Sequence, residues 1–377
     1  MTLLPISNQP LPYAWGSPTL MADFLAVPET GEPMAEVWFG THPGSPTKVL
    51  DAANGNLRER LAGELPFLVK FLAAAKPLSI QAHPTLQHAK QQFAIEESSG
   101  LPAADPTRNY KDANHKPELL VALTEFRALI GFRPIAESLE ELAALQPATP
   151  ALADLSRALE GGGYRAAVEW IFSENGGRET IQSAGLVATA GIGKHRARLI
   201  EQLSLEYPAD PGQLVALLMN LVTMRPGEAV FVAAGEIHAY LSGLGVEVMA
   251  ASDNVLRGGL TPKRVDVGEL CRVLDFTETL EPLVSPKAIA NGVFGYPVPV
   301  PDFSCTRLEP DGSRNMPELK LDSEAIVVCT AGQVELTTSR GDAMSMHRGS
   351  AAYIGTEARH ISIFGSGTVF LVTTSLG

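Results

Sequence analysis

Hydrophobic and polar positions divide the chain into two stretches with the period of β-strands and, between them, one stretch with the period of helices. Before residue 134, short apolar runs separated by turns containing Pro and Gly predict strands at 35–39, 66–70, 75–83 and 119–123. Within this stretch, residues 86–97 predict one helix, whose inward side chains would be Leu86, Ala89 and Phe93.

From Pro134 the composition changes to Ala, Leu and Glu, and the apolar spacing predicts helices at 137–145, 152–159, 164–172 and 195–205. Asp210-Pro211 supplies a capping residue and a proline suited to the first helical position, which predicts a further helix running through Leu221. Strands are then predicted again at 230–233 and 245–250. The helices therefore interrupt a β domain.

After residue 276 the pattern consists of short strands and Gly-containing turns, with strands predicted at 325–329, 333–338, 351–354, 361–364 and 368–373. This spacing is typical of a β-sandwich or small barrel. The predicted fold is therefore mainly β with a helical insertion. Its parts are a first β domain at 1–133 and 223–275, a helical domain at 134–222, and a second β domain at 276–377.

The stretch Leu78 to Pro84 carries the first chemical signal. If it is a strand, Ser79, Gln81 and His83 share one face, and the apolar residues between them share the other. A polar row facing the inside of a barrel is costly unless it is hydrogen-bonded or coordinated. An exposed edge strand with a solvated polar face is the alternative.

Two further polar clusters supply partners for this row. Residues 109–118 run into the apolar strand at 119–123, and residues 236–240 follow a predicted turn. Together the clusters give two imidazoles, one carboxylate and one amide oxygen as candidate ligands: His83, His238, Glu118 and Gln81. Zinc suits this set, although composition alone does not separate zinc from iron or manganese.

Composition and charge restrict the partners. The chain has 377 residues, of which 45% are hydrophobic and 19% charged, and no apolar run approaches the length of a membrane span. Three widely spaced cysteines and the absence of a secretory signal pattern favour the cytoplasm. A net charge of −13 disfavours nucleic acid and requires local positive groups for any anionic substrate. We expect Arg257 and Lys263 to supply them, since Gly258 and Gly259 allow close backbone approach.

The chain resembles the type I phosphomannose isomerases in several long motifs. These are YAWGS at 13–17, AEVWFGTHP at 35–43, LSIQAHP at 78–84, NYKDANHKPE at 109–118, GEIHAY at 235–240 and DNVLRGGLTPK at 253–263. The resemblance implies a cupin-type catalytic domain interrupted by a helical domain and followed by a second cupin-like domain. It also implies that Gln81, His83, Glu118 and His238 bind one zinc ion per chain, and that Arg257 is a functional arginine.

The expected activity is therefore reversible isomerisation of mannose 6-phosphate and fructose 6-phosphate through an enediol, a reaction that can supply mannose for activated-sugar (GDP-mannose) synthesis. Two alternatives are an iron cupin oxygenase and a cupin that binds a sugar phosphate without turnover. Gln81 and the basic residues disfavour the oxygenase. Lys116, Glu118 and Arg257 disfavour the non-catalytic binder. The sequence does not give the oligomeric state, and a monomer is the working expectation.

Strand alternation also selects a general base. Lys116 and Glu118 would share one face, whereas His115 would point away, so Lys116 is preferred and His115 is the alternative. Zinc, Arg257 and partial burial would each favour the neutral amine that a base requires. Pairing with the substrate phosphate or with a carboxylate is an equally weighted role for this lysine. Lys263, Ser79 and Trp15 are the expected substrate contacts.

The second β domain carries two histidines, His347 and His360, and neither lies in a ligand motif like those of the first domain. We therefore expect it to bind no metal and to pack against the catalytic domain.

Overall fold

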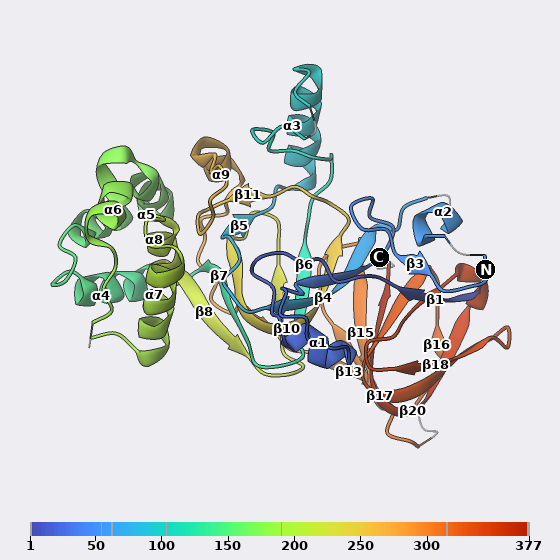
Figure 1. Ribbon diagram of the computed structural model, residues 1–377. Helices are drawn as coiled ribbons and strands as arrows, with labels where there is room; N and C mark the ends of the chain where they lie inside the picture. The colour runs from blue at the N-terminus through green and yellow to red at the C-terminus, as the bar shows by residue number, and fades with distance from the viewer. Residues whose placement is uncertain are drawn as a thin grey trace.

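The computed structural model describes residues 2–53, 55–61, 63–102, 104–189, 191–313 and 316–374. A group of helices occupies one end of the molecule, a β domain lies in the middle, and the C-terminal strands form the other end (Figure 1). The protein is mainly β, and its named strands pair antiparallel. In the described part of the chain, no helix is both long and apolar enough to cross a lipid bilayer.

The central β domain is built around one long strand, β10 (His238–Ala250). Its second half pairs with β4 (Phe67–Ala74) and β6 (Glu118–Ala122), and its first half pairs with β5 (Gln81–Ala82) and β7 (Phe126–Phe132). The register with β7 shifts between Tyr240 and Ser242. Because β10 pairs with both groups of strands, its side chains lie in both parts of the domain. The remaining strands are β2 (Glu36–Phe39), β8 (Met219–Met224), β9 (Ala229–Val232), β11 (Leu256–Arg257) and β12 (Leu283–Val284).

The predicted strand at 75–83 is reduced in the structure to β5. The residues before it form no continuous strand: the Leu78 N–H donates to the Tyr240 carbonyl of β10 at 2.8 Å, whereas the Ile80 N–H donates to the Gly259 carbonyl of the loop after β11 at 3.0 Å. Apolar alternation does not reveal this difference, because the local pattern is the same whichever acceptor the backbone finds.

The helical domain contains α4 (Ile135–Leu145), α5 (Leu152–Phe172), the π-helical turn η1 (Glu174–Arg178), α6 (Glu179–Ala184), α7 (Lys194–Glu206) and α8 (Gly212–Leu217). Its apolar faces meet in one core that includes Leu142, Leu155, Ile171, Leu199 and Leu214. Both helices predicted at 152–159 and 164–172 are present within α5, which is interrupted between them by non-helical backbone at Gly162 and Gly163.

Two helix predictions were wrong in detail. The helix after Pro211 ends at Leu217, and Leu221 lies on β8 opposite Leu129 of β7. Apolar residues at 217, 218 and 221 fit a helical period, but pairing with β7 determines the structure there. In α3 (Leu86–Ser98), Ala89 is buried as predicted, whereas Leu86 is 37% exposed. The remaining helices are α1 (Leu20–Leu25), α2 (Leu57–Leu61) and α9 (Val267–Val273).

The C-terminal sheet contains β13 (Lys287–Ala290), β14 (Val293–Tyr296), β15 (Ser304–Leu308), β16 (Leu319–Lys320), β17 (Ala325–Thr338), β18 (Ala343–His347), β19 (Ala351–Ile354) and β20 (His360–Thr373), and a 3-10 turn, η2 (Thr356–Ala358), precedes β20. The strands predicted at 325–329 and 333–338 are one strand, as are those at 361–364 and 368–373. The N-terminal strand β1 (Leu3–Ser7) also joins this sheet, between β19 and β3 (Lys48–Val49). The two ends of the sequence therefore share one sheet.

Candidate active site

The four predicted ligands come together in the central β domain. Gln81 on β5 lies directly opposite His238, the first residue of β10, and His83 follows β5. Glu118 is the first residue of β6 and lies opposite Met249, near the other end of β10. The strand pairing thus brings together residues separated by more than a hundred positions in sequence.

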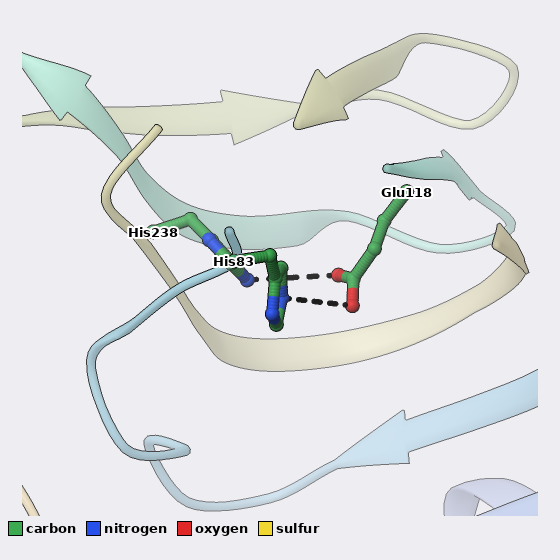
Figure 2. Close-up of side chains that lie close together, drawn as sticks. All are labelled: His83, Glu118 and His238. Carbon is green, nitrogen blue, oxygen red and sulfur yellow. Dashed lines mark ion pairs between the residues drawn. The ribbon is translucent and has the colours of Figure 1, made fainter. Parts of the chain in front are cut away.

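His83, Glu118 and His238 form a buried cluster whose ligand atoms all lie within 4.8 Å of one another. Figure 2 shows both imidazoles directed at the Glu118 carboxylate, with His83 Nε2 at 3.2 Å from Oε1 and His238 Nε2 at 3.6 Å from Oε2. Among the described residues, this is the only group of three or more His, Cys, Asp or Glu side chains that meets this geometry.

The backbone fixes the tautomer of both imidazoles. His83 Nδ1 lies 2.7 Å from the Asn254 carbonyl oxygen, and His238 Nδ1 lies 3.1 Å from the Glu236 carbonyl oxygen. A carbonyl can only accept, so Nδ1 carries the proton and Nε2 of the neutral ring keeps its lone pair. This is how metal-binding histidines are commonly oriented.

The ionisation states suit a cation. Burial lowers the pKa of His238 to about 4, and burial followed by the Lys116 charge lowers the pKa of His83. Burial alone would raise the pKa of Glu118, but the Lys116 ammonium 2.9 Å away holds that pKa well below its usual value. The cluster therefore presents neutral imidazoles and an ionised carboxylate.

A metal ion fits these residues. His83 Nε2 is buried without a hydrogen-bond partner, which is costly for a polar atom and is relieved by coordination. Gln81 lies at the same small cavity as Glu118 and His238, and its Nε2 donates to Ser79 Oγ at 3.2 Å, so its Oε1 is the atom left to act as a ligand. Two imidazoles with two oxygen donors suit zinc.

Asn254 connects the metal cluster to two of the sequence motifs. Its side chain is fully buried, and its Oδ1 accepts from the Lys111 N–H at 2.7 Å. Its Nδ2 donates to the carbonyls of Asp112 and Asn114, both at 2.8 Å. The motif at 109–118 is therefore fixed against the motif at 253–263, and the Asn254 carbonyl in turn orients His83.

The cluster lies beside a cavity of about 1070 Å³, which is large enough for a small sugar phosphate. The cavity brings together the predicted metal ligand Gln81 with predicted substrate and catalytic residues, namely Trp15, Ser79, Lys116, Arg257 and Lys263. Leu78 also lines the cavity, although strict alternation would have placed it on the opposite face from Ser79.

Arg257 and Lys263 give the cavity local positive charge. Arg257 Nη1 donates to Ser79 Oγ at 2.8 Å, and burial lowers its pKa. The Arg257 charge, followed by burial, lowers the pKa of Lys263. Among the residues that the structure describes, neither cation forms an ion pair with a carboxylate. Two neighbouring cations that repel each other attract an anionic ligand.

His115 lies outside this arrangement. Its Nε2 contacts both carboxylate oxygens of Asp302, at 3.0 and 2.9 Å, and it is absent from the cavity lining. Lys116 lines the cavity instead. The geometry thus agrees with the alternation that placed Lys116, and not His115, on the face of Glu118.

The sequence analysis missed a second buried polar group, which lines the same small cavity as the metal cluster. Lys70 Nζ lies 2.8 Å from Glu247 Oε2 and 3.7 Å from Glu36 Oε1, and Trp38 Nε1 donates to Glu36 Oε2 at 2.6 Å. Tyr240 Oη donates to Glu118 Oε2 at 3.0 Å. A lone charged residue inside each apolar strand was the available signal, because such residues are seldom buried without partners.

The comparisons with known proteins agree with this geometry. Residues 3–135 match the family model described as phosphomannose isomerase type I, catalytic domain. The chain is 34% identical over 387 residues to the mannose-6-phosphate isomerase of Escherichia coli (strain K12), with 97% of each chain covered. It is 32% identical over 406 residues to the mannose-6-phosphate isomerase of Homo sapiens, with 94% of this chain and 93% of the human chain covered.

Solved structures show the same fold. A crystal structure of mannose 6-phosphate isomerase from Salmonella typhimurium, bound to its substrate fructose 6-phosphate and to zinc, superposes with a TM-score of 0.90 at 32% identity, and both chains are covered completely. A crystal structure of mannose 6-phosphate isomerase bound with zinc and yttrium gives the same TM-score, identity and coverage.

Proposed function

The chain belongs to the type I phosphomannose isomerase family, and from this premise we propose that it catalyses the zinc-dependent, reversible isomerisation of mannose 6-phosphate and fructose 6-phosphate. The observation that carries the proposal is the buried cluster of His83, Glu118 and His238 beside a cavity lined by Arg257 and Lys263, which form no ion pair within the described part of the chain. One zinc ion per chain would be held by these three residues and Gln81. Zinc supplies Lewis acidity, which polarises carbonyl and hydroxyl oxygens.

The other residues of the cavity have separate roles in substrate binding. Arg257 and Lys263 bind the anionic end of the substrate or stabilise the developing enediolate oxygens, since both are cations without a carboxylate partner in the described chain. Ser79 holds Arg257 in place through the 2.8 Å hydrogen bond. Trp15 contributes an apolar wall, where its ring stacks on Tyr13 with centroids 5.8 Å apart.

Lys116 is the residue we assign to proton transfer between C1 and C2 of the sugar. It lines the cavity beside the metal cluster, and its Nζ lies 2.9 Å from Glu118 Oε1. Proton abstraction requires the neutral amine, which a zinc ion bound by Glu118 would favour. A general base must reach the carbon acid of the bound sugar, and Lys116 lines the cavity whereas His115 faces Asp302. The enediol intermediate then takes the proton back on the neighbouring carbon.

The physiological setting follows from the same assignment. The described cysteines, Cys271, Cys305 and Cys329, are all free and buried, which supports a reducing compartment such as the cytoplasm. The partner is the sugar phosphate, with neither nucleic acid nor membrane involved, and the working unit is a monomer. The product would serve mannose metabolism, including the supply of activated mannose.

The test is a metal analysis combined with a coupled assay on mannose 6-phosphate. We expect one zinc per chain and formation of fructose 6-phosphate that stops when zinc is chelated and resumes when it is restored. Zinc-loaded protein that binds mannose 6-phosphate without turnover would identify a sugar-phosphate sensor. Iron dependence with oxygen consumption would identify an oxygenase. Either result would overturn the proposal.

A further inference from the structure

The segment 257–263, at the end of β11 and the loop after it, carries the cavity cations Arg257 and Lys263 and has a strained backbone. Gly259 has φ of +113°, and the next residue, Leu260, has φ of +52° although it has a side chain and is 1% exposed. A non-glycine residue in the left-handed region is strained, so neighbouring structure must hold it there.

Part of this support comes from the helical domain, from Asp210 in the turn between α7 and α8. Asp210 Oδ2 accepts a hydrogen bond from the Thr261 N–H at 2.8 Å, and Oδ1 accepts from the Gly212 N–H at 2.7 Å. One carboxylate therefore joins the backbone of the cavity loop to the backbone at the start of α8. On its other side the loop is bonded to the approach to β5, where the Gly258 N–H donates to the Ile80 carbonyl at 2.7 Å.

The two backbones also touch directly. A Cβ added to Gly259 would lie 2.4 Å from Gly212 Cα, and a Cβ added to Gly212 would lie 2.6 Å from the Leu260 nitrogen. Neither position has room for a side chain. The two glycines thus set the distance between α8 and the loop, and the hydrogen bonds of Asp210 hold the two backbones in a fixed relative position.

The same turn forms part of the cavity wall. Leu205, Glu206 and Tyr207 line the cavity together with the loop residues Arg257 and Lys263. Tyr207 Oη donates to the Pro77 carbonyl at 2.7 Å, next to the segment that leads to the predicted ligand Gln81. The end of α7 and the turn after it are therefore placed to set the shape of the cavity as well as the path of the loop.

We infer that Asp210 is a positioning residue for substrate binding: through Thr261 and the contact of Gly212 with Gly259, it holds the 257–263 loop so that Arg257 and Lys263 meet the phosphate. This inference rests on the proposed function. It makes the helical domain a working part of the active site, acting on the anion-binding side of the cavity and leaving the metal cluster unchanged.

The direction in which anion affinity changes distinguishes a positioning role of Asp210 from a purely electrostatic one. Removing a negative charge beside a cationic cavity would, by Coulomb attraction alone, tighten the binding of an anion. Removing a positioning group weakens it, because the cations lose their alignment. The experiment compares the zinc-loaded parent with Asp210→Ala. It measures KM and kcat for mannose 6-phosphate, the inhibition constant of inorganic phosphate, the zinc content and Tm.

For Asp210→Ala we expect KM and the phosphate inhibition constant each to rise about tenfold or more, with one zinc per chain retained and kcat changed much less. Asp210→Asn, which keeps one oxygen acceptor for the Thr261 N–H, should recover part of the loss. The matched control is Asp154→Asn, an exposed carboxylate of the same helical domain that pairs with Arg157. It should leave KM and the phosphate constant unchanged.

Unchanged or tighter phosphate binding in Asp210→Ala would overturn the inference, whatever happens to Tm. If Asp210→Ala does not fold, Asp210→Asn provides the test, because its amide keeps one oxygen acceptor: a smaller rise in KM and in the phosphate inhibition constant is expected, and unchanged or tighter phosphate binding would overturn the inference. A parent that binds phosphate without isomerising the sugar would contradict the proposed function. The role of Asp210 would then be judged from phosphate binding measured by calorimetry.

Discussion

At the scale of single residues, the active site depends on atoms whose proton positions are set by backbone carbonyls. The carbonyls of Asn254 and Glu236 hold Nδ1 of the two imidazoles, and they leave both Nε2 atoms directed at Glu118. A buried Nε2 without a partner, as in His83, is stable only if a ligand compensates it. The first prediction tests whether these residues bind a metal ion.

Replacing His238 by Ala should lower zinc affinity at least about tenfold and reduce isomerase activity with it, because the site loses one neutral nitrogen donor. The measurement is zinc content after dialysis against a chelator of known affinity, followed by the coupled assay. The double variant with His347 and His360 replaced by Ala is the control. Since these residues lie in the C-terminal β domain, it should keep one zinc per chain. Full zinc retention and turnover in His238→Ala would contradict the metal assignment.

Replacing Lys116 by Met should leave zinc bound and mannose 6-phosphate binding nearly unchanged, while kcat falls by at least about a hundredfold because the proton has no acceptor. Exchange of the C2 proton with deuterated water should be lost with turnover. Lys90→Met, at an exposed position of α3 outside the cavity, is the matched control and should keep both. Retained exchange in Lys116→Met would assign proton transfer to another group, and the zinc assignment would stand.

At the scale of elements, three neighbouring strands carry one charged residue each into the interior. Glu247 of β10 lies opposite Lys70 of β4, and Glu36 of β2 reaches the same ammonium group. A buried ion pair stabilises little by itself, but leaving one member unpaired is costly, so the pairing restricts how these strands can align. Burial raises the pKa of Glu247 to about 7, although Lys70 opposes the shift.

The raised pKa of Glu247 predicts a pH dependence of stability. Between about pH 4.5 and 7 the folded protein holds a proton here that the unfolded chain has released, so this group's contribution is present below that window and is lost as the pH rises through about 7. In zinc-free protein, Glu247→Gln should therefore remove a fall in unfolding free energy on the order of 3 kcal/mol between pH 5 and 8.

Denaturant unfolding of zinc-free protein at several pH values measures this effect. The charged groups and the phenol facing Glu247 are Lys70, Glu36, Glu118, Lys116 and Tyr240, and they are common to parent and variant. Glu281→Gln, at an exposed position, serves as the control and should keep the parent slope. Identical slopes for Glu247→Gln and the parent would show that Glu247 does not titrate in this range.

At the scale of the whole molecule, the C-terminal β domain is completed by the start of the chain. β1 pairs with β19 on one side and with β3 on the other, and its Leu4 and Ile6 are buried. We propose to keep the division into 1–133, 134–222, 223–275 and 276–377 as a description of the sequence, but the N-terminal strand belongs to the distant sheet. His115 and Asp302 form a further link between the catalytic and C-terminal parts.

Truncating a side chain on β1 should therefore destabilise the C-terminal sheet. Ile6→Ala removes a side chain that is 3% exposed and should cost about 2–5 kcal/mol of unfolding free energy, through lost burial and the cavity it leaves. Ile289→Ala on β13 of the same sheet is the matched control, because Ile289 is 67% exposed, and it should change stability little. Equal unfolding midpoints in denaturant for the two variants would contradict this account of β1.

The sequence determined the elements and the chemical identity of the site. Apolar periodicity is a local property, so it was enough to predict α3, α4, α7 and the alternation between β and helical regions. The residue types of the ligands and a shared side for Lys116 and Glu118 could also be predicted, although Lys116 precedes β6 and Leu78 lines the cavity against strict alternation.

Only the tertiary structure decided which distant groups meet. The pairing of β10 with four strands, the insertion of β1 beside β19 and the contact of Asp210 with Thr261 each join residues with no local signal in common. The burial of Lys70 between two glutamates and the turn of His115 toward Asp302 are of the same kind. These contacts depend on packing between segments that are distant in sequence. Local sequence allows several hydrogen-bonding partners for each group, and this packing determines which partner is bound.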